Sequence, residues 1–317
     1  MKILRGVHSL SQPLPKAVVT IGNFDGVHLG HQEILTQAIQ RAKARGGVSV
    51  AYTFRPHPQY ALRTDNPPKL LMTYDEKLEA LGRLGVDYAV EEPFTREFSS
   101  ISPEEFFTER LFKGLGAQAI VVGYDFAFGK GREGHLEKLE VLARAAGVEL
   151  TIVAPCKVDG EIISSSRIRN HLLSGSIPEA NALLGRQFFY RGVVVRGEGR
   201  GRKIGFPTAN LRLEDKLVLP YGVYAGTSLV DGVEYASVTN IGVRPTFQAA
   251  AAAGVPATME LALIEVHLLD QTIDLYGRTL EVRFAQRLRD ERKFSGIDAL
   301  KEQIGKDVAE TRRLAGS

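Results

Sequence analysis

The chain has 317 residues, of which 44% are hydrophobic and 24% charged, and its formal net charge is +3. This is the composition of a folded globular protein long enough for two domains, and the small net charge gives no reason to expect nonspecific binding to nucleic acid. Cys156 is the only cysteine, which suits a reducing cytoplasm. The first ten residues lack the apolar core of a signal peptide, and no apolar run approaches the roughly 20 residues that cross a bilayer. We therefore expect a soluble, cytoplasmic protein that binds neither membranes nor nucleic acid.

The first half of the chain alternates strand and helix patterns. Residues 16–22 (KAVVTIG) form a short apolar run that ends in glycine, and residues 31–46 then carry apolar side chains at helical spacing. Thr73 and Glu76 have the spacing of a capping box at the start of a second helix, and Ser102 is placed to cap a third. Four further runs predict strands, the last two of them buried: residues 47–54, 87–94, 117–126 and 148–155. Strands separated by helices indicate an α/β fold, a doubly wound parallel sheet with helices on its faces.

The second half is rich in β-branched and aromatic residues. Five runs predict strands: residues 188–197, 221–230, 233–242, 259–270 and 279–288. Asp231 and Gly232 form a strong hairpin-turn signal between the second and third of these runs. Such a series predicts an antiparallel barrel or sandwich, and residues 297–314 predict a helix at its end. The pattern changes next to Leu184 and Gly185, so we expect two domains, residues 1–184 and 185–317.

The stretch GNFDGVHLGH, residues 22–31, follows the first predicted strand and leads into a helix. Doubly wound folds bind ligands at the carboxyl ends of their strands, and the start of a helix favours anions. Gly26 and Gly30 let the backbone approach a ligand closely. His28 and His31 share a helix face and would donate hydrogen bonds to charge that develops on a phosphate. The alternatives are that both histidines are merely polar or that they bind a metal, but metal sites usually need three or four ligands.

Three later stretches add groups that can bind phosphate. FRPHP, residues 54–58, holds His57 in a stiff loop between two prolines, where a structural role is the alternative. GYDFAFGKG, residues 123–131, puts Asp125 just past a predicted strand. ISSSRIRN, residues 163–170, offers three hydroxyls and two arginines at a helix start. That combination suits a β- or γ-phosphate, although hydroxyls at such a place are ordinary helix caps in most proteins.

In the second half, GEGRGRKIGFPTANL, residues 197–211, joins a glycine-rich basic turn to a proline. The N–H groups of such a turn form a nest for anions, and the alternative is a solvated basic loop or a nucleic-acid contact. After Pro207 the chain is expected to be extended, which places Thr208 and Asn210 on one side. A hydroxyl and an amide oxygen are ligands that Mg²⁺ accepts, with water and phosphate completing its shell, and a plain turn is the alternative.

Glu265 lies within the apolar strand pattern LIEVHLLD, residues 263–270. A carboxylate among leucine, isoleucine and valine is costly unless it has a partner or a task. A kinase that acts on a hydroxyl needs such a group to orient or accept the departing proton. The alternative is that strand alternation simply turns Glu265 towards solvent.

The string G-x-F-D-G-x-H-x-G-H resembles the H-x-G-H motif of nucleotidylyltransferases, which transfer a nucleotidyl group from a nucleoside triphosphate and release pyrophosphate. Together with FRPHP, GYDFAFG, ISSSRIR and PTAN, it makes the chain resemble prokaryotic bifunctional riboflavin kinase/FAD synthetase over nearly its whole length. The resemblance implies an amino-terminal FMN adenylyltransferase domain and a carboxy-terminal riboflavin kinase barrel with a terminal helix. It also implies ATP as co-substrate, Mg²⁺, no covalently bound cofactor, and riboflavin, FMN, FAD, ADP and pyrophosphate as the other small molecules.

The same resemblance implies roles for individual residues. The catalytic residues would be His28 and His31 for adenylyl transfer and Glu265, as a base, for the kinase. The adenylyltransferase site would bind ATP phosphates through Gly22, Asn23, Phe24, Asp25, Gly30, His57, Asp125, Ser164, Ser166 and Arg169. The kinase site would bind them through Gly199, Gly201, Lys203, Gly205, Pro207, Thr208 and Asn210, with Thr208 and Asn210 also holding the metal. The flavin would be bordered by Asn240, Arg289, Glu291 and Phe294, with a solvated helix face as the alternative for Arg289 and Glu291.

Some positions depart from the family pattern. Ser166 stands where threonine is expected, which keeps the hydroxyl, and Ala127 stands where many relatives carry arginine, which removes a charge near the nucleotide. Residues 248–258 form a segment longer than usual, to which we assign no role. Two rival functions remain, a nucleotidylyltransferase for another phosphate acceptor with a barrel that only binds, and a nucleic-acid-binding protein that uses RGEGRGRK. The small net charge and the lack of tryptophan count against the second rival.

Overall fold

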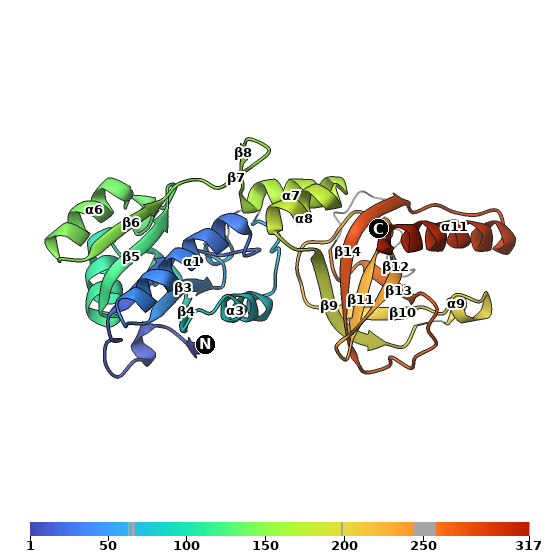
Figure 1. Cartoon of the computed structure of the whole chain (residues 1–317), viewed down its shortest axis with the longest axis horizontal. Coiled ribbons are helices and arrows are strands. Elements are labelled where there is room, and N and C mark those ends of the chain that lie inside the picture. The colour runs from blue at the N-terminus through green and yellow to red at the C-terminus, as the bar shows by residue number, and fades with distance from the viewer. Residues whose placement is uncertain (63, 65–66, 198, 244–257, 317) are drawn as a thin grey trace. The chain divides into compact units, whose positions relative to one another are not determined.

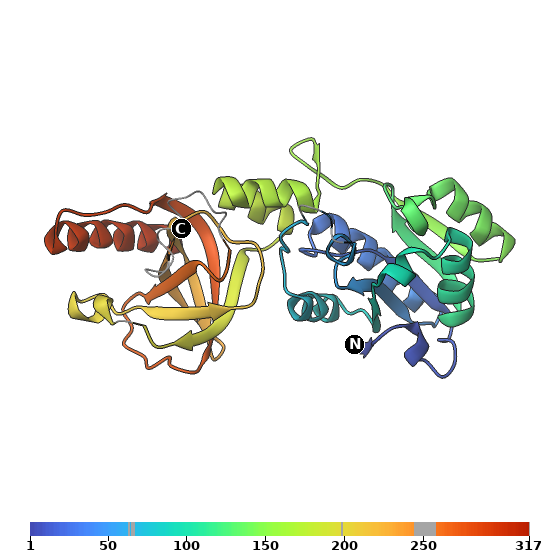
Figure 2. The same cartoon turned by 180° about the vertical axis from the view of Figure 1, so that it is seen from behind.

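The chain, seen in a computed structural model, folds into two compact units, Met1–Ser165 and Ser166–Ser317. The structure describes all residues except 63, 65–66, 198, 244–257 and 317. The first unit contains a parallel sheet and the second a closed barrel, which the ribbons of Figures 1 and 2 show from two sides. Of the two architectures predicted for the second half, a barrel or a sandwich, the structure shows the barrel.

Six parallel strands form the sheet of the first unit. From one edge to the other they are β1 (Lys2–Leu4), β4 (Tyr88–Pro93), β3 (Ser49–Arg55), β2 (Ala17–Ile21), β5 (Ala117–Gly123) and β6 (Glu149–Val153). The chain runs outward from β2 through β3 and β4, and then returns to the other side of β2 to form β5 and β6. The strand order therefore reverses between β2 and β5, and such a reversal is where doubly wound sheets bind ligands.

Helices cover both faces of this sheet. On one face, α1 (Leu29–Ala44) shares a hydrophobic cluster with Val18 of β2. On the other face, Val19 belongs to a second cluster together with η2 (Phe106–Gly114) and α6 (Leu136–Ala145). Successive residues of β2 thus enter opposite cores, because side chains alternate along a strand. The predicted doubly wound α/β fold is confirmed.

Capping residues begin the helices of this unit where the sequence indicates. Thr73 and Glu76 form the complete capping box of α3 (Tyr74–Arg83), and Ser102 caps α5 (Pro103–Glu105). Both predicted caps are confirmed. The remaining short elements are η1 (Val7–Ser9), α2 (Pro58–Ala61), α4 (Arg96–Ser99), η3 (Lys130–Arg132), β7 (Lys157–Val158) and β8 (Glu161–Ile162).

The two edge strands of the sheet differ from the prediction. The strand expected at residues 148–155 is confirmed as β6, but its expected burial is wrong, because β6 lies at the sheet edge beside β5 and only its last residue, Val153, is buried. β1 is a strand that the apolar patterns do not indicate, and it pairs with β4 at the opposite edge without burying a side chain. An edge strand has a neighbour on one flank only, so its sequence carries a weaker apolar signal.

The second unit is a closed antiparallel barrel. Its strands follow the order β10 (Ala209–Leu213), β13 (Ala262–Leu268), β12 (Val233–Val243), β11 (Gly222–Val230), β14 (Thr279–Asp290) and β9 (Phe188–Val195), and β9 pairs again with β10. Asp231 and Gly232 join β11 to β12 with positive φ values of 47° and 85°, as the hairpin signal predicts. Buried rings of Tyr190, Tyr224 and Phe284 pack edge to face against one another in the barrel.

In the described part of the second half, the helices beside the barrel strands are α7 (Ser165–Ser174), α8 (Ile177–Leu184), α9 (Arg200–Lys203) and α11 (Ile297–Ala315). Asn181 holds α8 to the barrel, since its amide donates to the carbonyl of Phe284 at 2.9 Å and its oxygen accepts the N–H of Phe188 at 2.7 Å. The predicted terminal helix is confirmed as α11, which packs on β11 and β12. The compact units divide after Ser165, the first residue of α7, whereas the sequence pattern changes after α8, so the domain boundary at Leu184 and Gly185 stays a prediction.

Candidate active sites

The loop between β2 and α1 has a strained backbone. Phe24, Gly26 and Val27 have positive φ values of 50°, 86° and 40°. A bulky or β-branched residue in this region costs free energy, so the surrounding structure must hold the loop in place. The loop leaves β2 at the reversal of strand order and ends at His28, which caps α1. Its position is therefore that of a ligand-binding loop.

His28 and His31 lie against each other at the start of α1. Their rings stack with centroids 3.6 Å apart and planes inclined by 17°, and the Nδ1 of His28 accepts the backbone N–H of His31 at 3.3 Å. The proton of a neutral His28 therefore sits on Nε2, from which it can be donated to a ligand. A side chain at Gly30 would come within 3.3 Å of the His28 ring, so this glycine leaves room for the ring. Phe24 contacts His31 edge-on, with ring centroids 5.4 Å apart.

The pKa of His31 lies well below its ordinary value. Burial is the largest cause, followed by the positive charges of His28 and Lys77. The Nδ1 of His31 is buried and makes no hydrogen bond within the described part of the chain. His31 is therefore neutral at neutral pH, so it can act on a phosphate as a neutral hydrogen-bond donor and not as a cation.

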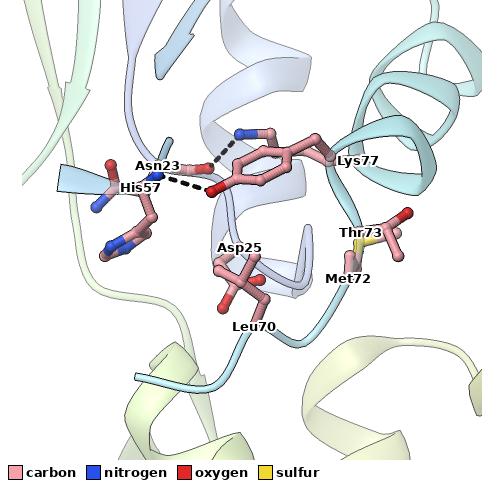
Figure 3. A pocket seen from close by; sticks show the side chains of 8 residues that line it. Asn23, Asp25, His57, Leu70, Met72, Thr73 and Lys77 are labelled. Carbon is pink, nitrogen blue, oxygen red and sulfur yellow. Dashed lines mark hydrogen bonds between the residues drawn. The ribbon is translucent and has the colours of Figure 1, made fainter. Parts of the chain in front are cut away.

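A small pocket beside this loop brings three of the predicted phosphate-binding residues together. Asn23, Asp25 and His57 line it, and Figure 3 shows them close to Lys77 of α3. The backbone N–H of His57 donates to the hydroxyl of Tyr74 at 2.8 Å, and the His57 Nδ1 caps α2. The structure thus gives His57 a capping role, and its contact with phosphate stays a prediction.

The carboxylate of Asp25 is already engaged within the protein. Both of its oxygens lie near the backbone nitrogen of Leu71, at 2.9 and 3.2 Å, and the residue is buried. The carbonyl of Asp25 accepts the hydroxyl of Ser165 at 2.9 Å. Asp25 therefore joins the loop to two later segments of the chain. Any contact that it makes with phosphate has to coexist with this structural role.

Asp125 lies beyond the end of β5, the strand next to β2 at the reversal. Its carboxylate packs back over Gly123, where an added side chain would approach the Asp125 Oδ1 to 3.3 Å. Ala127 follows between Phe126 and Phe128, whose rings stack with centroids 5.4 Å apart. The effect of alanine at this position on the adenylyl step stays a prediction.

The remaining residues of the predicted adenylyltransferase site surround the start of α7. Ser164 directly precedes this helix, and Ser166 and Arg169 lie in its first turns. The boundary between the compact units passes between Ser165 and Ser166. The predicted approach of Ser166 and Arg169 to the histidine pair therefore stays a prediction, as does the phosphate contact of Ser164.

On the barrel, Asn210, Glu265 and Asn240 form a row across three neighbouring strands. Asn210 of β10 pairs in register with Glu265 of β13, which also pairs with Asn240 of β12. Register partners point to the same face of a sheet. The neighbours of Glu265 along its strand, Ile264 and Val266, are fully buried, so the row faces the outside of the barrel, where all three side chains are partly buried.

The glycines of the basic turn allow its backbone to lie close to Asn210 and to the PTAN segment. A side chain at Gly197 would lie 2.2 Å from the amide nitrogen of Asn210, and one at Gly201 would lie 2.3 Å from the carbonyl oxygen of Phe206 and 3.2 Å from the Thr208 hydroxyl. Gly199 and Gly205 have positive φ values of 68° and 90°. The turn therefore needs glycine for its backbone and for its contacts with the PTAN segment. Lys203 ends the short helix α9 within it.

His267 holds the proline of the PTAN segment. Its Nδ1 lies 2.8 Å from the carbonyl oxygen of Pro207, and its ring packs edge-on against Phe206 with centroids 5.6 Å apart. Because a carbonyl can only accept, the His267 Nδ1 carries the proton. These three residues help to line a groove of about 390 Å³, together with Gly205, Leu269, Asp270, Gln271, Thr272, Gly305, Val308 and Arg312.

Arg289 lies near the end of β14, so the alternative of a solvated helix face is wrong for this residue. Its guanidinium donates to the buried carboxylate of Asp307 in α11 through contacts of 2.8 to 3.1 Å. It also lies over the ring of Phe294, 5.6 Å from the ring centroid. Arg289 therefore ties β14 to α11, and its contact with flavin stays a prediction.

Glu291 follows β14 in an irregular segment, so it too lies outside any helix. A side chain at Gly242 of β12 would collide with its carboxylate, so Glu291 packs directly on that backbone. Desolvation, followed by the charge of Glu265, raises the pKa of Glu291, and Arg289 opposes the shift. The electrostatic coupling places the carboxylates of Glu265 and Glu291 near each other beside the row.

The candidate metal ligands on the barrel are neutral oxygens. The hydroxyl of Thr208 and the amide oxygen of Asn210 are hard donors, and Mg²⁺ takes a few such oxygens together with phosphate and water. Among the described residues, no group of three or more His, Cys, Asp or Glu side chains could hold a metal ion. This donor set fits a Mg²⁺ ion that arrives with ATP phosphates, not a transition metal held by the protein alone.

Lys77 and His267 are site residues that the sequence patterns did not identify. Lys77 is the fourth residue of a capped helix with many charged side chains, where a lysine normally faces solvent, and no sequence signal marks it as buried. His267 follows Glu265 by two residues, and the period of a strand puts both on one face. That spacing is the signal that could have identified His267.

Comparison with known proteins gives two family matches and close relatives. The family model described as FAD synthetase matches residues 10–167, and the one described as riboflavin kinase matches residues 184–315. The chain is 38% identical over 309 residues to the bifunctional riboflavin kinase/FMN adenylyltransferase of Bacillus subtilis (strain 168), covering 96% of this chain and 95% of the relative. It is also 38% identical over 318 residues to the protein of that name from Escherichia coli (strain K12), covering 100% and 98%.

A crystal structure named as a macrolide-efflux protein from Streptococcus pneumoniae has the same fold. Its TM-score is 0.85, its sequence is 33% identical, and the match covers 98% of each chain. The name of that protein points to efflux, whereas the family models and the curated relatives are named for flavin-nucleotide enzymes. In the part of this chain that the structure describes, no helix has the length and apolar character needed to cross a membrane.

Proposed function

This chain belongs to the bifunctional riboflavin kinase/FMN adenylyltransferase family, and from this premise we propose how its two sets of motif residues divide the work. The enzyme phosphorylates riboflavin to FMN with ATP, and it adenylylates FMN with a second ATP to give FAD and pyrophosphate. Residues 1–184 carry the adenylyl transfer and residues 185–317 the kinase reaction. Both reactions require mainly positioning and stabilisation of phosphate charge.

In the kinase reaction, the terminal ribityl hydroxyl of riboflavin attacks the γ-phosphorus of ATP, and ADP leaves. Glu265 accepts the hydroxyl proton as the new bond forms. The turn from Gly199 to Gly205 cradles the phosphates with its N–H groups, and Lys203 adds positive charge. Thr208 and Asn210 would hold a Mg²⁺ ion, which would supply neutralisation of the phosphate charge. The flavin is bordered by Asn240, Arg289, Glu291 and Phe294.

In the adenylyl transfer, a phosphate oxygen of FMN attacks the α-phosphorus of ATP. The bond from that phosphorus to the oxygen bridging to the β-phosphate breaks, and pyrophosphate leaves with the electron pair. His28 and the neutral His31 donate hydrogen bonds to the charge that develops on the α-phosphate oxygens. The phosphates are placed by Asn23, His57 and Asp125, and the leaving pyrophosphate is held by Ser164, Ser166 and Arg169. No covalent intermediate is needed, because FMN supplies the nucleophile.

One observation supports this proposal: the histidine pair and the Asn210–Glu265 pair each lie at a place suited to the task proposed for them. The histidine pair stands at the reversal of the parallel sheet, in a strained loop at a helix start. The Asn210–Glu265 pair stands in register on the outer face of the barrel, beside a turn that only glycine can form. These are two separate constellations, and each one meets the requirements of a different phosphorus transfer.

Reciprocal substitutions test the proposal. We expect His28→Ala to lower the rate of FAD formation from FMN by about 100-fold or more, the effect of removing one transition-state donor. FMN formation from riboflavin should stay unchanged in this variant. Asn210→Ala and Glu265→Gln should do the reverse, abolishing FMN formation while FAD is still made from supplied FMN. Chromatography of both flavin products over time measures each outcome, and a folded variant that lost both reactions would contradict the two-site assignment.

The same assay distinguishes the rival functions. If riboflavin, ATP and Mg²⁺ give no FMN while another phosphate compound is adenylylated, the barrel is a binding module and the kinase assignment fails. Salt-sensitive retention of RNA without flavin turnover would favour a nucleic-acid-binding protein. We propose the cytoplasm as the place of both reactions, and cell fractionation followed by detection of the chain tests this.

A further inference from the structure

Lys77 is a buried lysine that neither proposed reaction uses. It lies in the first half of α3 and is 5% exposed. An ammonium group taken out of water costs several kcal/mol unless each of its donors finds a partner. Its Nζ lies 2.8 Å from the Thr53 hydroxyl, 3.2 Å from the Asn23 carbonyl and 3.4 Å from the Phe54 carbonyl. The three N–H groups are thus matched by three acceptors, so Lys77 is not placed to bind a phosphate itself.

The partners of Lys77 belong to the elements that build the adenylyltransferase site. Thr53 and Phe54 end β3, and Asn23 begins the strained loop that leads from β2 to His28. The segment just before α3 holds the same loop from a second side, since the N–H of Leu71 donates to the Asp25 carboxylate. We call these contacts, from Leu71 to Asp25 and from Lys77 to Asn23, Thr53 and Phe54, the α3 clamp. Figure 3 shows its Lys77–Asn23 bond and Asp25 beside it.

The clamp is also an electrostatic element. Burial lowers the pKa of Lys77 to about 8, with a further lowering by Arg55, while the Asp25 carboxylate acts in the opposite direction. The ammonium lies 5.4 Å from the centre of the Tyr74 ring, which faces it from the same helix. Lys77 is therefore charged at neutral pH. Its charge, after burial and the charge of His28, contributes to the low pKa of His31.

We propose that Lys77 is a positioning residue for FMN adenylylation: by tying α3 to the carbonyl of Asn23 and to the end of β3, it holds the β2–α1 loop in its strained form and thereby keeps His28 and His31 in place. Phe24 and Val27 adopt positive φ values that the loop would leave if it were released. This inference rests on the assignment of the histidine pair to adenylyl transfer. A shift of about 1 Å in such a pair is enough to lower a rate by roughly 100-fold.

Substitution of Lys77 tests the proposal in the full-length chain. Lys77→Met keeps the length of the side chain and removes its charge and donors, and Lys77→Arg keeps the charge. Lys113→Met is the matched control, because Lys113 is an exposed lysine of the same unit that pairs with Glu109 on its own helix. We expect Lys77→Met to lower kcat for FAD formation about 100-fold while kinase activity stays within twofold. Lys77→Arg should recover part of the loss, and Lys113→Met should behave as the unchanged protein.

The pKa of His31 is a second measurement, and it would not change if Lys77 only stabilised the fold. Burial is the largest cause of its low pKa, and the charges of His28 and Lys77 lower the pKa further. Loss of the Lys77 charge should therefore raise the pKa of His31 in Lys77→Met but not in Lys77→Arg, as followed by NMR of histidine-labelled protein. Unchanged His31 titration in Lys77→Met, or FAD formation within threefold of normal, would overturn the proposal.

A measurement on the unsubstituted protein covers the case in which Lys77→Met does not fold. If the clamp needs the ammonium, kcat for FAD formation should fall as the pH rises past about 8, where Lys77 loses its proton. A constant kcat up to pH 10 would contradict the clamp. The variant His28→Ala distinguishes failure of the clamp from failure of the histidine assignment. If His28→Ala forms FAD at the normal rate, the histidine assignment is wrong. If His28→Ala loses FAD formation while Lys77→Met forms FAD at the normal rate, only the clamp is wrong.

Discussion

The imidazole rings of His28 and His31 stack with their centroids 3.6 Å apart, and the backbone N–H of His31 donates to the Nδ1 of His28. Two imidazolium ions at this separation would repel each other strongly, so the pair cannot carry two charges near neutral pH. His31 is therefore the neutral member of the stack, and it acts on a phosphate through the orientation of its donor and not through a charge.

The titration of His31 follows from this arrangement. Its folded-state pKa lies well below 6.5, so between these values the unfolded chain binds a proton that the folded chain does not. Protons then favour the unfolded state, and the free energy of unfolding of the first unit should fall as the pH drops below 6.5. Urea unfolding at several pH values should show a smaller fall in His31→Gln than in the unsubstituted protein.

The exposed His135 provides the control for that experiment. It precedes α6 and makes no side-chain cap, so His135→Gln controls for the loss of one exposed imidazole from the same unit. In NMR of histidine-labelled protein, the resonance of His31 should not titrate near pH 6.5. A midpoint at the ordinary value would show that burial does not affect this residue as inferred.

The contact between Gly197 and Asn210 predicts a specific defect of the kinase. A methyl group at position 197 would lie 2.2 Å from the Asn210 amide nitrogen, so Gly197→Ala should displace this side chain from its place beside Glu265. We expect kcat/KM for riboflavin phosphorylation to fall about 100-fold, with FAD formation from supplied FMN unchanged. Gly296→Ala is the control, because its methyl group would meet open space and its backbone is extended. Equal activity of the two variants would refute the role given to the Asn210 amide.

His267 should act on the kinase through Pro207. Its Nδ1–H donates to the Pro207 carbonyl at 2.8 Å, next to Thr208 of the proposed metal site. Loss of one such hydrogen bond costs about 0.5–1.5 kcal/mol, so His267→Ala should raise KM for Mg²⁺–ATP by roughly 2- to 12-fold. His267→Gln can still donate to this carbonyl and should recover part of the affinity. Steady-state kinetics at fixed riboflavin measures both variants, and an unchanged KM in His267→Ala would remove the link to Pro207.

Local signals in the sequence predict the architecture well, for physical reasons. Apolar spacing and capping residues such as Thr73 act within a few residues of chain, and so does the turn at Asp231 and Gly232. These signals indicate the helices, the hairpin and both fold classes. β1 escapes them, and the burial of the predicted strand β6 is overestimated, because an edge strand needs few buried side chains.

The parts of the sites that escape prediction depend on contacts between distant segments. The row of Asn210, Glu265 and Asn240 exists only through the register of three strands, and no local pattern encodes that register. The local sequence predicts that Lys77 is exposed, and only its contacts with β3 and the β2–α1 loop show that it is buried. Motif residues thus mark where chemistry takes place, whereas the residues that hold them are revealed only by the fold.

The capping box of α3 offers a final test, because it begins the helix that carries Lys77. The hydroxyl of Thr73 accepts the N–H of Glu76 at 3.2 Å, and the Glu76 carboxylate accepts the N–H of Thr73 at 2.9 Å. Thr73→Ala removes the first bond and should lower the free energy of unfolding by about 1 kcal/mol. Thr95→Ala is the control, since Thr95 caps α4, a short helix that does not line the pocket. If the start of α3 positions the clamp, Thr73→Ala should slow FAD formation more than Thr95→Ala does, and FMN formation should be equal in both variants. Equal rates of FAD formation would show that fraying of α3 does not affect His28.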